Sequence, residues 1–322
     1  MRLKLVPDQT NYNFFGYARI TFGASVVAVI LSVILIVTMG LNFGIDFKGG
    51  TTIRTESTKA VDVGAYRAAM IPLGLGDVSI TEVFDPGFGP EKNVAMVRIQ
   101  AQDGFEAVTP ELILSVEQAL QGVDPSITFP SVESVGPKVS GELIWSAILA
   151  VVGALTAILI YIWLRFEWQF AVGAVVSLAH DVIVTVGIFA LFQIKFDLAV
   201  IAALLTILGY SINDTVVVFD RLRENLIKFK TTPLIEVMNL SVNETLSRTV
   251  MTSGTTLIAL IALLVLGGDV IRGFTFAIAF GIVIGTYSSV YVAKNVVLYL
   301  GVTRDWTKKD DKPGTQFSNI DA

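Results

Sequence analysis

Two polar side chains, Asn213 and Asp214, stand side by side inside an apolar run of the chain. The run ends in a burst of charge at residues 220–224, which marks where a lipid-buried helix leaves the membrane. A carboxylate inside such a helix is costly unless it pairs or faces water, so it is a functional candidate. Asp214 lies roughly 8 Å inside the edge at Phe219, at 1.5 Å of rise per residue. Its chemistry would be proton binding and release; the alternative is a structural carboxylate bonded to a neighbouring helix.

Arg248, at the start of a later apolar run, is the candidate partner of Asp214. A guanidinium stays protonated at physiological pH. It could therefore hold Asp214 ionised in one conformation and release it in another. An anchor that reaches to the lipid headgroups explains the position of Arg248 equally well when the position is considered alone.

His180 and Asp181 lie near the middle of a third apolar run. Adjacent positions point in different directions round a helix, so we expect that the two cannot both face one partner. Hydrogen bonding between helices is the favoured explanation of the pair, and a secondary place on a proton path is the alternative. Asn213 is expected to orient helix contacts through its amide.

The composition identifies an integral membrane protein. Of 322 residues, 53% are hydrophobic and only 16% are charged, whereas a soluble domain carries nearer a quarter charged residues. The chain has no cysteine and a single histidine, so disulfides, thiolate metal sites and His-rich metal sites are excluded, and no cofactor is expected. No basic tract is dense enough to bind nucleic acid.

Six apolar runs approach the roughly 20 residues that span a bilayer. They cover 20–41, 143–164, 168–192, 198–219, 250–267 and 273–300. Lys and Arg concentrate in the arm 1–19, in the loop 220–249 and in the tail 301–322, which predicts that both termini are cytoplasmic. The loop is expected to contain an interfacial helix at 232–246, and the tail is expected to be disordered.

Residues 42–142, between the first two runs, are predicted to form an external domain. Strand-like and helical segments alternate there in the order β-α-β-β-α-β, which is the split βαβ arrangement of a ferredoxin-like sheet. The helix at 109–121 should have Thr109 as its N-cap and Pro110 at its first position. The expected fold is thus a polytopic α-helical membrane protein, with six transmembrane helices and one ferredoxin-like α+β domain.

Small side chains recur every four residues on the last run, at Ala277, Gly281, Gly285 and Ser289. Such a ladder lets another helix approach closely. Packing within the chain is the favoured explanation, and a contact with a partner subunit is the alternative. Gly49 and Gly50, before the first strand of the domain, are expected to shape a helix-to-strand turn.

Four segments in order resemble the motif set of the SecF family. They are FGIDFKGGT (43–51), GYSINDTVVVFDRLREN (209–225), LSRTVMTSGTTL (246–257) and GFTFAIAFGIVIGTYSSVYVA (273–293). The resemblance extends over nearly the whole chain. It places Asp214 on the acidic residue of that family's proton transport, favours a functional role for Arg248, and makes Asp46, Gly49, Gly50 and Thr51 part of a family motif.

The resemblance also implies partners and a role. Members of this family pair with the six-helix SecD subunit within the resistance-nodulation-division superfamily. The pair associates with the SecYEG channel, often with YajC, in the bacterial inner membrane. It uses the proton gradient to assist the late export of preproteins and is not thought to hydrolyse anything.

Two other classes of protein are weighed against this one. A proton-driven small-molecule exporter of the same superfamily would carry twelve helices and two large external loops, whereas this chain has six helices and one loop. An intramembrane aspartyl protease would use Asp181 and Asp214, which would have to share a proton at about 3 Å. No GxGD-type motif is present.

Overall fold

The computed structural model describes residue 7 and residues 10–75, 78–83, 92–100 and 109–302. Within these residues, six helical segments are long and apolar enough to cross a membrane, which confirms the predicted number. The tail predicted to be disordered, at 303–322, lies outside the described residues, as does most of the arm before residue 10. The membrane helices are α1 (Ala18–Met39), α5 (Pro137–Arg165), α6 (Trp168–Phe192), α7 (Leu198–Lys228), α8 (Leu234–Leu266) and the successive pair α9 (Gly268–Tyr291) and α10 (Ala293–Leu300).

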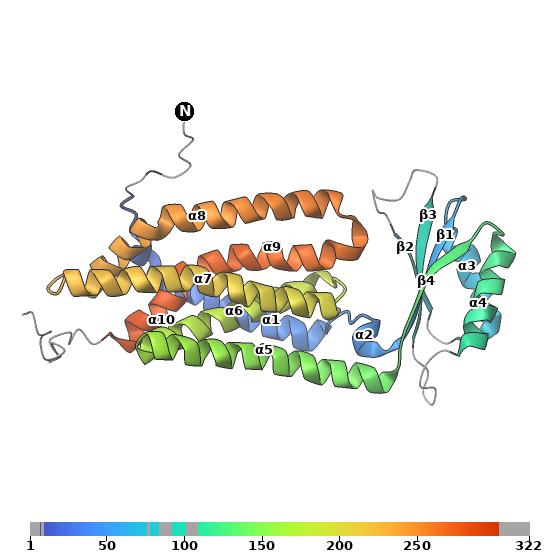
Figure 1. Ribbon diagram of the computed structural model, residues 1–322, viewed down its shortest axis with the longest axis horizontal. Coiled ribbons are helices and arrows are strands. Elements are labelled where there is room, and N and C mark those ends of the chain that lie inside the picture. Colours follow the sequence, from blue (N-terminus) through green and yellow to red (C-terminus); the bar gives the residue numbers. More distant parts are fainter. Residues whose placement is uncertain (1–6, 8–9, 76–77, 84–91, 101–108, 303–322) are drawn as a thin grey trace, which may run out of the picture.

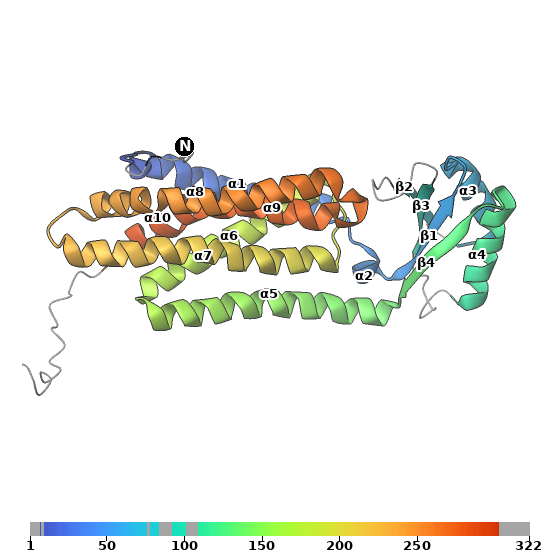
Figure 2. The same ribbon diagram turned by 45° about the horizontal axis from the view of Figure 1, so that its top comes forward.

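The helices form an elongated bundle with an α+β domain at one end (Figure 1). We call this the domain end and the opposite one the far end. α6, α7 and the α9–α10 pair make the centre, since half of the most apolar stretch of α6 is buried, compared with 6% of that of α5. α1, α5 and α8 lie outside this centre (Figure 2). Their outer faces expose aliphatic side chains such as Ile30, Leu149 and Ile258, which suit lipid.

The far end differs from the loop predicted at 220–249. α7 continues to Lys228 and α8 begins at Leu234, so the connection is only residues 229–233. No separate interfacial helix is present, because α8 runs unbroken from Leu234 to Leu266. Polar contacts between the two helices explain the difference: Asn225 of α7 donates to Ser241 of α8 at 3.0 Å and to Glu244 at 2.7 Å. The charged segment is thus a helical hairpin.

The last membrane segment, predicted as one helix at 273–300, is broken. α9 ends at Tyr291, Val292 takes φ −95° and ψ −60°, and α10 begins at Ala293. The described N-terminal segment lies at the same far end as α10 (Figure 1), where the Asn243 side chain of α8 accepts from the Tyr12 amide at 2.8 Å.

The domain has the predicted ferredoxin-like order. Its sheet is arranged β2 (Val78–Val83), β3 (Asn93–Gln100), β1 (Gly50–Ser57) and β4 (Thr128–Val135), with every neighbouring pair antiparallel. α3 (Val63–Met70) and α4 (Pro110–Val123) cover the face turned away from the bundle (Figure 1). Thr109 caps α4 by accepting from the Leu112 amide, and Pro110 opens the helix, as predicted.

The alternation of side chains along β3 determines which residues lie on each face of the sheet. Val97 and Ile99 are buried in the core beneath α3 and α4. Because side chains alternate across a strand, Arg98 and Gln100 point to the other face, toward the bundle. There they line a cavity of about 160 Å³ with residues of the segment between α1 and β1.

Candidate functional site

Asp214 lies on α7 in the centre of the bundle and is 3% exposed. The groups that act on its carboxyl come from two other helices: Thr252, Ser253 and Arg248 of α8, and Lys294 of α10. Its Oδ2 atom is buried without a hydrogen-bond partner among the described residues. An unpaired carboxylate oxygen in a dry site costs free energy, and it leaves a position where a proton can bind without breaking a hydrogen bond.

Arg248 is exposed and interacts with Asp214 through space. It lines a cavity of about 510 Å³ at the far end, which we call the charged vestibule. The predicted partnership of Arg248 with Asp214 is therefore an interaction at a distance, with no ion pair between the two within 4.0 Å among the described residues. The other residues that line the charged vestibule are Tyr161, Arg165, Phe166, Val216, Val217, Asp220, Arg221, Glu224, Glu244 and Thr245.

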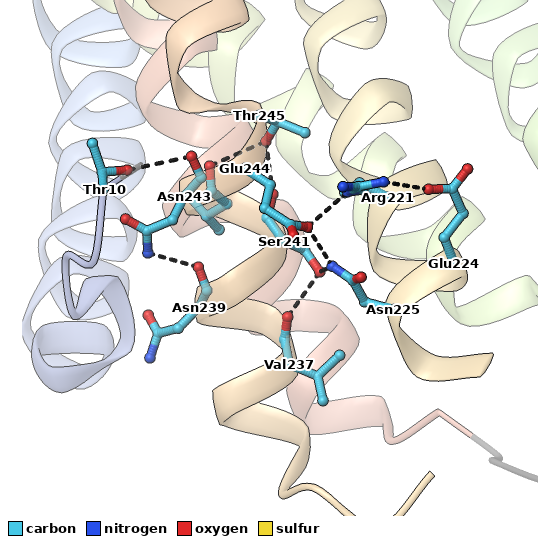
Figure 3. Close-up of polar contacts among 11 residues, drawn as sticks. Thr10, Arg221, Glu224, Asn225, Val237, Asn239, Ser241, Asn243, Glu244 and Thr245 are labelled. Atoms are coloured by element: carbon cyan, nitrogen blue, oxygen red, sulfur yellow. Dashed lines mark hydrogen bonds and ion pairs between the residues drawn. The ribbon is translucent and has the colours of Figure 1, made fainter. Parts of the chain in front are cut away.

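One ion pair, between Arg221 and Glu244, holds α7 to α8 along the charged vestibule, and a second, between Arg221 and Glu224, lies within α7 (Figure 3). Arg221 donates from Nε to Glu244 and from Nη1 to Glu224, both at 2.7 Å, and Glu244 also accepts from Asn225. Three basic and three acidic side chains line the cavity, so their formal charges cancel. A cavity with balanced lining charges presents no electrostatic barrier of a single sign, so water and protons can enter it.

His180 and Asp181 form a second polar cluster, which we call the Asp181 node. Asp181 is fully buried on α6, and its Oδ1 lies 3.0 Å from His180 Nδ1. Its Oδ2 accepts from Ser211 of α7 at 2.7 Å and from Ser288 of α9 at 2.9 Å. The expectation that the two neighbours point apart overlooked their own contact, which forms because the imidazole reaches back to the adjacent carboxylate.

The Asp181 node is saturated with hydrogen bonds and ties three central helices together. This geometry favours hydrogen bonding between helices as the role of the pair. The donors to Asp181 are His180, Ser211 and Ser288, and no hydrogen bond joins it to Asp214 among the described residues. The two aspartates consequently lack the shared-proton geometry of a protease dyad.

Asn213 is exposed on the outer face of α7 and makes no hydrogen bond among the described residues, so its role in helix contacts stays a prediction. The reason for its exposure is the helical step of about 100° from Asp214, which points inward. Gly209 lies one turn away on the same exposed face, where nothing approaches the position of a Cβ atom within 4 Å.

The ladder of small residues packs against α7 of the same chain. A Cβ atom on Gly281 would lie 2.8 Å from Cγ2 of Ile207, and one on Gly285 would lie 3.0 Å from Cβ of Ser211. Ala277 and Ser289, the ends of the ladder, are also buried. Packing within the chain is thus the observed use of this face, and it is not open to lipid.

The predicted helix-to-strand turn is present at the domain end. Gly49 and Gly50 take φ of 72° and 121° between α2 (Ile45–Lys48) and β1, a conformation that side chains with a Cβ rarely adopt. Asp46 Oδ2 accepts from the Leu198 amide at 3.0 Å, at the start of α7. Thr51 is buried, and its hydroxyl lies 2.8 Å from that of Ser134 on β4. The motif therefore joins the domain to the helix that carries Asp214.

Comparisons with known proteins agree with these motifs. The family model "Protein export membrane protein SecD/SecF, C-terminal" matches residues 115–303, and "SecD/SecF GG Motif" matches residues 34–61. The protein translocase subunit SecF of Cereibacter sphaeroides is 72% identical over 321 residues, which cover 100% of this chain and 99% of that protein. The chain belongs to the SecF family.

More distant members of the SecF family share the same extent and fold. The protein translocase subunit SecF of Vibrio alginolyticus is 38% identical over 98% of this chain and 99% of its own length. The crystal structure of SecDF, a translocon-associated membrane protein from Thermus thermophilus, matches with a TM-score of 0.80 at 37% identity. It covers 93% of this chain, and this chain spans 40% of that one.

The structure adds one charged residue that the sequence analysis did not single out. Lys294, on α10, is fully buried and acts electrostatically on Asp214. The sequence contained a sign of it, since Lys294 stands inside the run 273–300 that was read as a membrane span. The rule that drew attention to Asp214, that an ionisable side chain at membrane depth is functional by default, applies to Lys294 equally.

Proposed function

We propose that this SecF-family chain is the proton-handling subunit of an accessory complex that assists protein translocation across the bacterial inner membrane. The observation that carries the proposal is Asp214, a buried carboxyl with one oxygen that lacks a hydrogen-bond partner among the described residues. Two cations act on it, Arg248 and Lys294, and Arg248 lines the charged vestibule. Family membership supports the translocation role and gives no support to a small-molecule exporter.

The energy scale of the site suits coupling to a proton gradient. Two unit charges about 4 Å apart at an effective dielectric constant of about 20 interact by about 4 kcal/mol, which is an upper limit for each cation here because no ion pair within 4.0 Å joins either one to Asp214 among the described residues. A proton that moves through 100 mV releases about 2.3 kcal/mol. Protonation of Asp214 would cancel its attraction for Arg248 and Lys294, a change of the same order as the driving force. The bound proton can therefore bias the positions of α7, α8 and α10.

A SecD-like subunit is the partner we propose. Asn213 and Gly209 lie on an outer face of α7, and an amide there would lack a partner in lipid. The Thermus protein is a SecDF chain more than twice as long as the matched region, which is consistent with a second half that covers such a face. Association with SecYEG, with YajC and with exported preproteins is proposed from the family resemblance.

The proposed orientation has both termini and the charged vestibule in the cytoplasm. It rests on the Lys and Arg content of the far end, whose hairpin carries Arg221, Arg223, Lys228 and Lys230. The α+β domain then lies on the periplasmic side. The subunit acts in this proposal through conformational coupling, without a hydrolytic step of its own.

The test is export of a preprotein into inverted membrane vesicles, with and without a proton gradient. Asp214→Asn fixes the site in a neutral form of nearly the same shape. We expect it to abolish the gradient-dependent stimulation and to leave ATP-driven export and co-purification with the SecD-like subunit intact. Glu236→Gln, the same chemical change at an exposed position of α8, is the matched control and should export normally. Full stimulation in Asp214→Asn would remove Asp214 from the mechanism.

A further inference from the structure

Lys294 is a buried, charged side chain that makes no hydrogen bond with its side-chain nitrogen among the described residues. Its exposed fraction is 0%. Lysine is almost never fully buried unless it is paired, because moving an ammonium out of water costs several kcal/mol. A chain that keeps such a group at membrane depth needs it there for its charge.

Lys294 stands at a break in the backbone. It is the second residue of α10, two positions after Val292, the residue that separates α9 from α10. Asn295 beside it is 1% exposed and donates to the Tyr291 carbonyl at 2.6 Å, across the break. α10 packs against α6, where Gly173 makes room: a Cβ there would lie 2.7 Å from the Ala293 carbonyl oxygen. Close packing of this kind keeps water from the lysine stem.

One charged group acts on Lys294 from across the bundle, and it is Asp214. The titratable groups on the other elements packed against α10 are engaged elsewhere or face away. On α6, Asp181 and His180 bond to each other, and on α8, Arg248 is exposed in the charged vestibule. On α9, Tyr287 donates to the Thr21 carbonyl at 2.8 Å, and its ring lies 5.1 Å from that of Tyr291, centroid to centroid, at an angle of 37°.

We infer that Lys294 is the buried counter-charge of Asp214 and sets how tightly Asp214 holds its proton. The inference rests on the proposed function of Asp214 and adds a residue to that site. Lys294 Nζ and Asp214 Oδ2 are both buried, each lacks a hydrogen-bond partner among the described residues, and the two charges act on each other across a gap wider than a hydrogen bond. Lysine is a point charge on a flexible four-carbon stem, and that stem can close such a gap when the carboxyl is ionised.

Lys294 should matter more to Asp214 than Arg248 does. Charges that face water are screened, whereas buried charges interact across a low dielectric. Arg248 is exposed and Lys294 is not. Arg248, the partner expected from the sequence, has the larger effect on Asp214 in this conformation, but water screens its exposed charge, so we expect the buried lysine to be the stronger partner in solution. Lys294 is thus a positioning residue that acts through Asp214.

The experiment is an infrared titration of the Asp214 carboxyl in the full chain, purified with its partner subunit. The band is assigned by its loss in Asp214→Asn. We expect Lys294→Met to move the titration midpoint to higher pH by at least about one pH unit, because a neighbouring cation shifts a carboxyl by about 1–3 units. Lys294→Arg should restore at least half of that shift, and Arg248→Met should move the midpoint less than Lys294→Met does. Lys228→Met, at an exposed lysine of α7, should leave it unchanged.

Coupling and folding are measured on the same variants. Lys294→Met should reduce gradient-dependent export at neutral pH at least tenfold, with partial rescue by Lys294→Arg. Its thermal midpoint should equal or exceed that of the wild type, because Met removes an unpaired buried charge. An unchanged titration in Lys294→Met, or a larger shift in Arg248→Met, overturns the inference. Failure of Asp214→Asn to uncouple export would refute the proposed function instead, and the titration would still report on Lys294.

Discussion

The contact of Gly281 with Ile207 offers a quantitative test of how the two central helices α7 and α9 pack. Ile207 is fully buried on α7. A methyl group on Gly281 would lie 2.8 Å from Cγ2 of Ile207 and nearer still to Cγ1 and Cδ1. Isoleucine is stiff at χ1, so its branched carbons cannot swing away without shifting the helix. Gly281→Ala should therefore force α7 and α9 apart.

The size of the effect follows from two opposing terms. Alanine is favoured over glycine in a helix by about 1 kcal/mol. Overpacking a well-filled core costs about 1–3 kcal/mol. We expect Gly281→Ala to lower the free energy of unfolding by up to about 2 kcal/mol net. Ile207→Ala alone should cost about 2–5 kcal/mol through the cavity it leaves. The double variant should cost less than the sum, with a coupling of about 1–3 kcal/mol, because the new methyl enters the vacated space.

Reversible unfolding of the purified chain in mild detergent, followed by near-ultraviolet circular dichroism, measures all four corners of the cycle. Gly153→Ala on α5 is the control, since nothing lies within 4 Å of a Cβ atom there. It should be neutral or stabilising by up to about 1 kcal/mol. Additive effects of Gly281→Ala and Ile207→Ala would refute the packing argument. Loss of the SecD-like subunit without any loss of stability would instead assign the ladder to the subunit interface.

Two further predictions concern carboxyl groups with full hydrogen bonding. Asp181→Ala should lower the free energy of unfolding by about 2–4 kcal/mol, because each unmade buried hydrogen bond costs about 1–3 kcal/mol. The substitution leaves the hydroxyls of Ser211 and Ser288 without their acceptor. An unfolding free energy equal to that of the wild type would contradict this role of Asp181. In the domain, hydrogen bonds from Ser57 and Ser126 hold the pKa of Asp124 well below its usual range. The carboxylate therefore stabilises the folded domain at pH values above about 3.8, its pKa in the unfolded chain, and this stabilisation is lost as pH falls below that value. The protection factors of the β1 amides in the full chain, which are exchange rates corrected for the intrinsic pH dependence of exchange, should fall as pH drops from about pH 4 toward pH 2, and an equally steep fall in Asp124→Asn would count against this cause.

The features that the sequence predicted well are those with a local pattern. Apolar runs of about 20 residues identify membrane helices because the bilayer imposes that length. The order of strands and helices in the domain followed from alternating β-branched runs and from the cap at Thr109 and Pro110. Asp214 was found by the cost of a charge at membrane depth, a property of one residue in its segment.

The features that the sequence analysis missed depend on contacts between segments. No proline marks the break at Val292, so the sequence predicted one continuous helix over 273–300. Lys294 lies inside that predicted span, and its charge was not singled out. The hairpin at the far end depends on Arg221 and Asn225 meeting Glu244, which no single-segment pattern contains. The outward direction of Asn213 likewise becomes clear only when the helices around α7 are placed.

α7 is the element in which the separate parts of the molecule meet. At its start, Leu198 donates to Asp46 of the glycine motif, and the charges of Asp46 and Asp197 act on Arg98 of the domain, whose pKa burial lowers. In its middle, Ser211 binds the Asp181 node and Asp214 interacts electrostatically with Lys294. At its end, the ion pairs of Arg221 line the charged vestibule.

A continuous helix of 31 residues links these three levels, and it contains no proline and no break. Hydrogen bonds along an unbroken helix resist bending, so a displacement at one level is transmitted to the others as a rigid shift or rotation. Protonation at Asp214 changes the charge at the middle level, where α7, α8 and α10 converge. The same helix begins against the domain, so a shift produced by one proton reaches the domain end without any further intermediary.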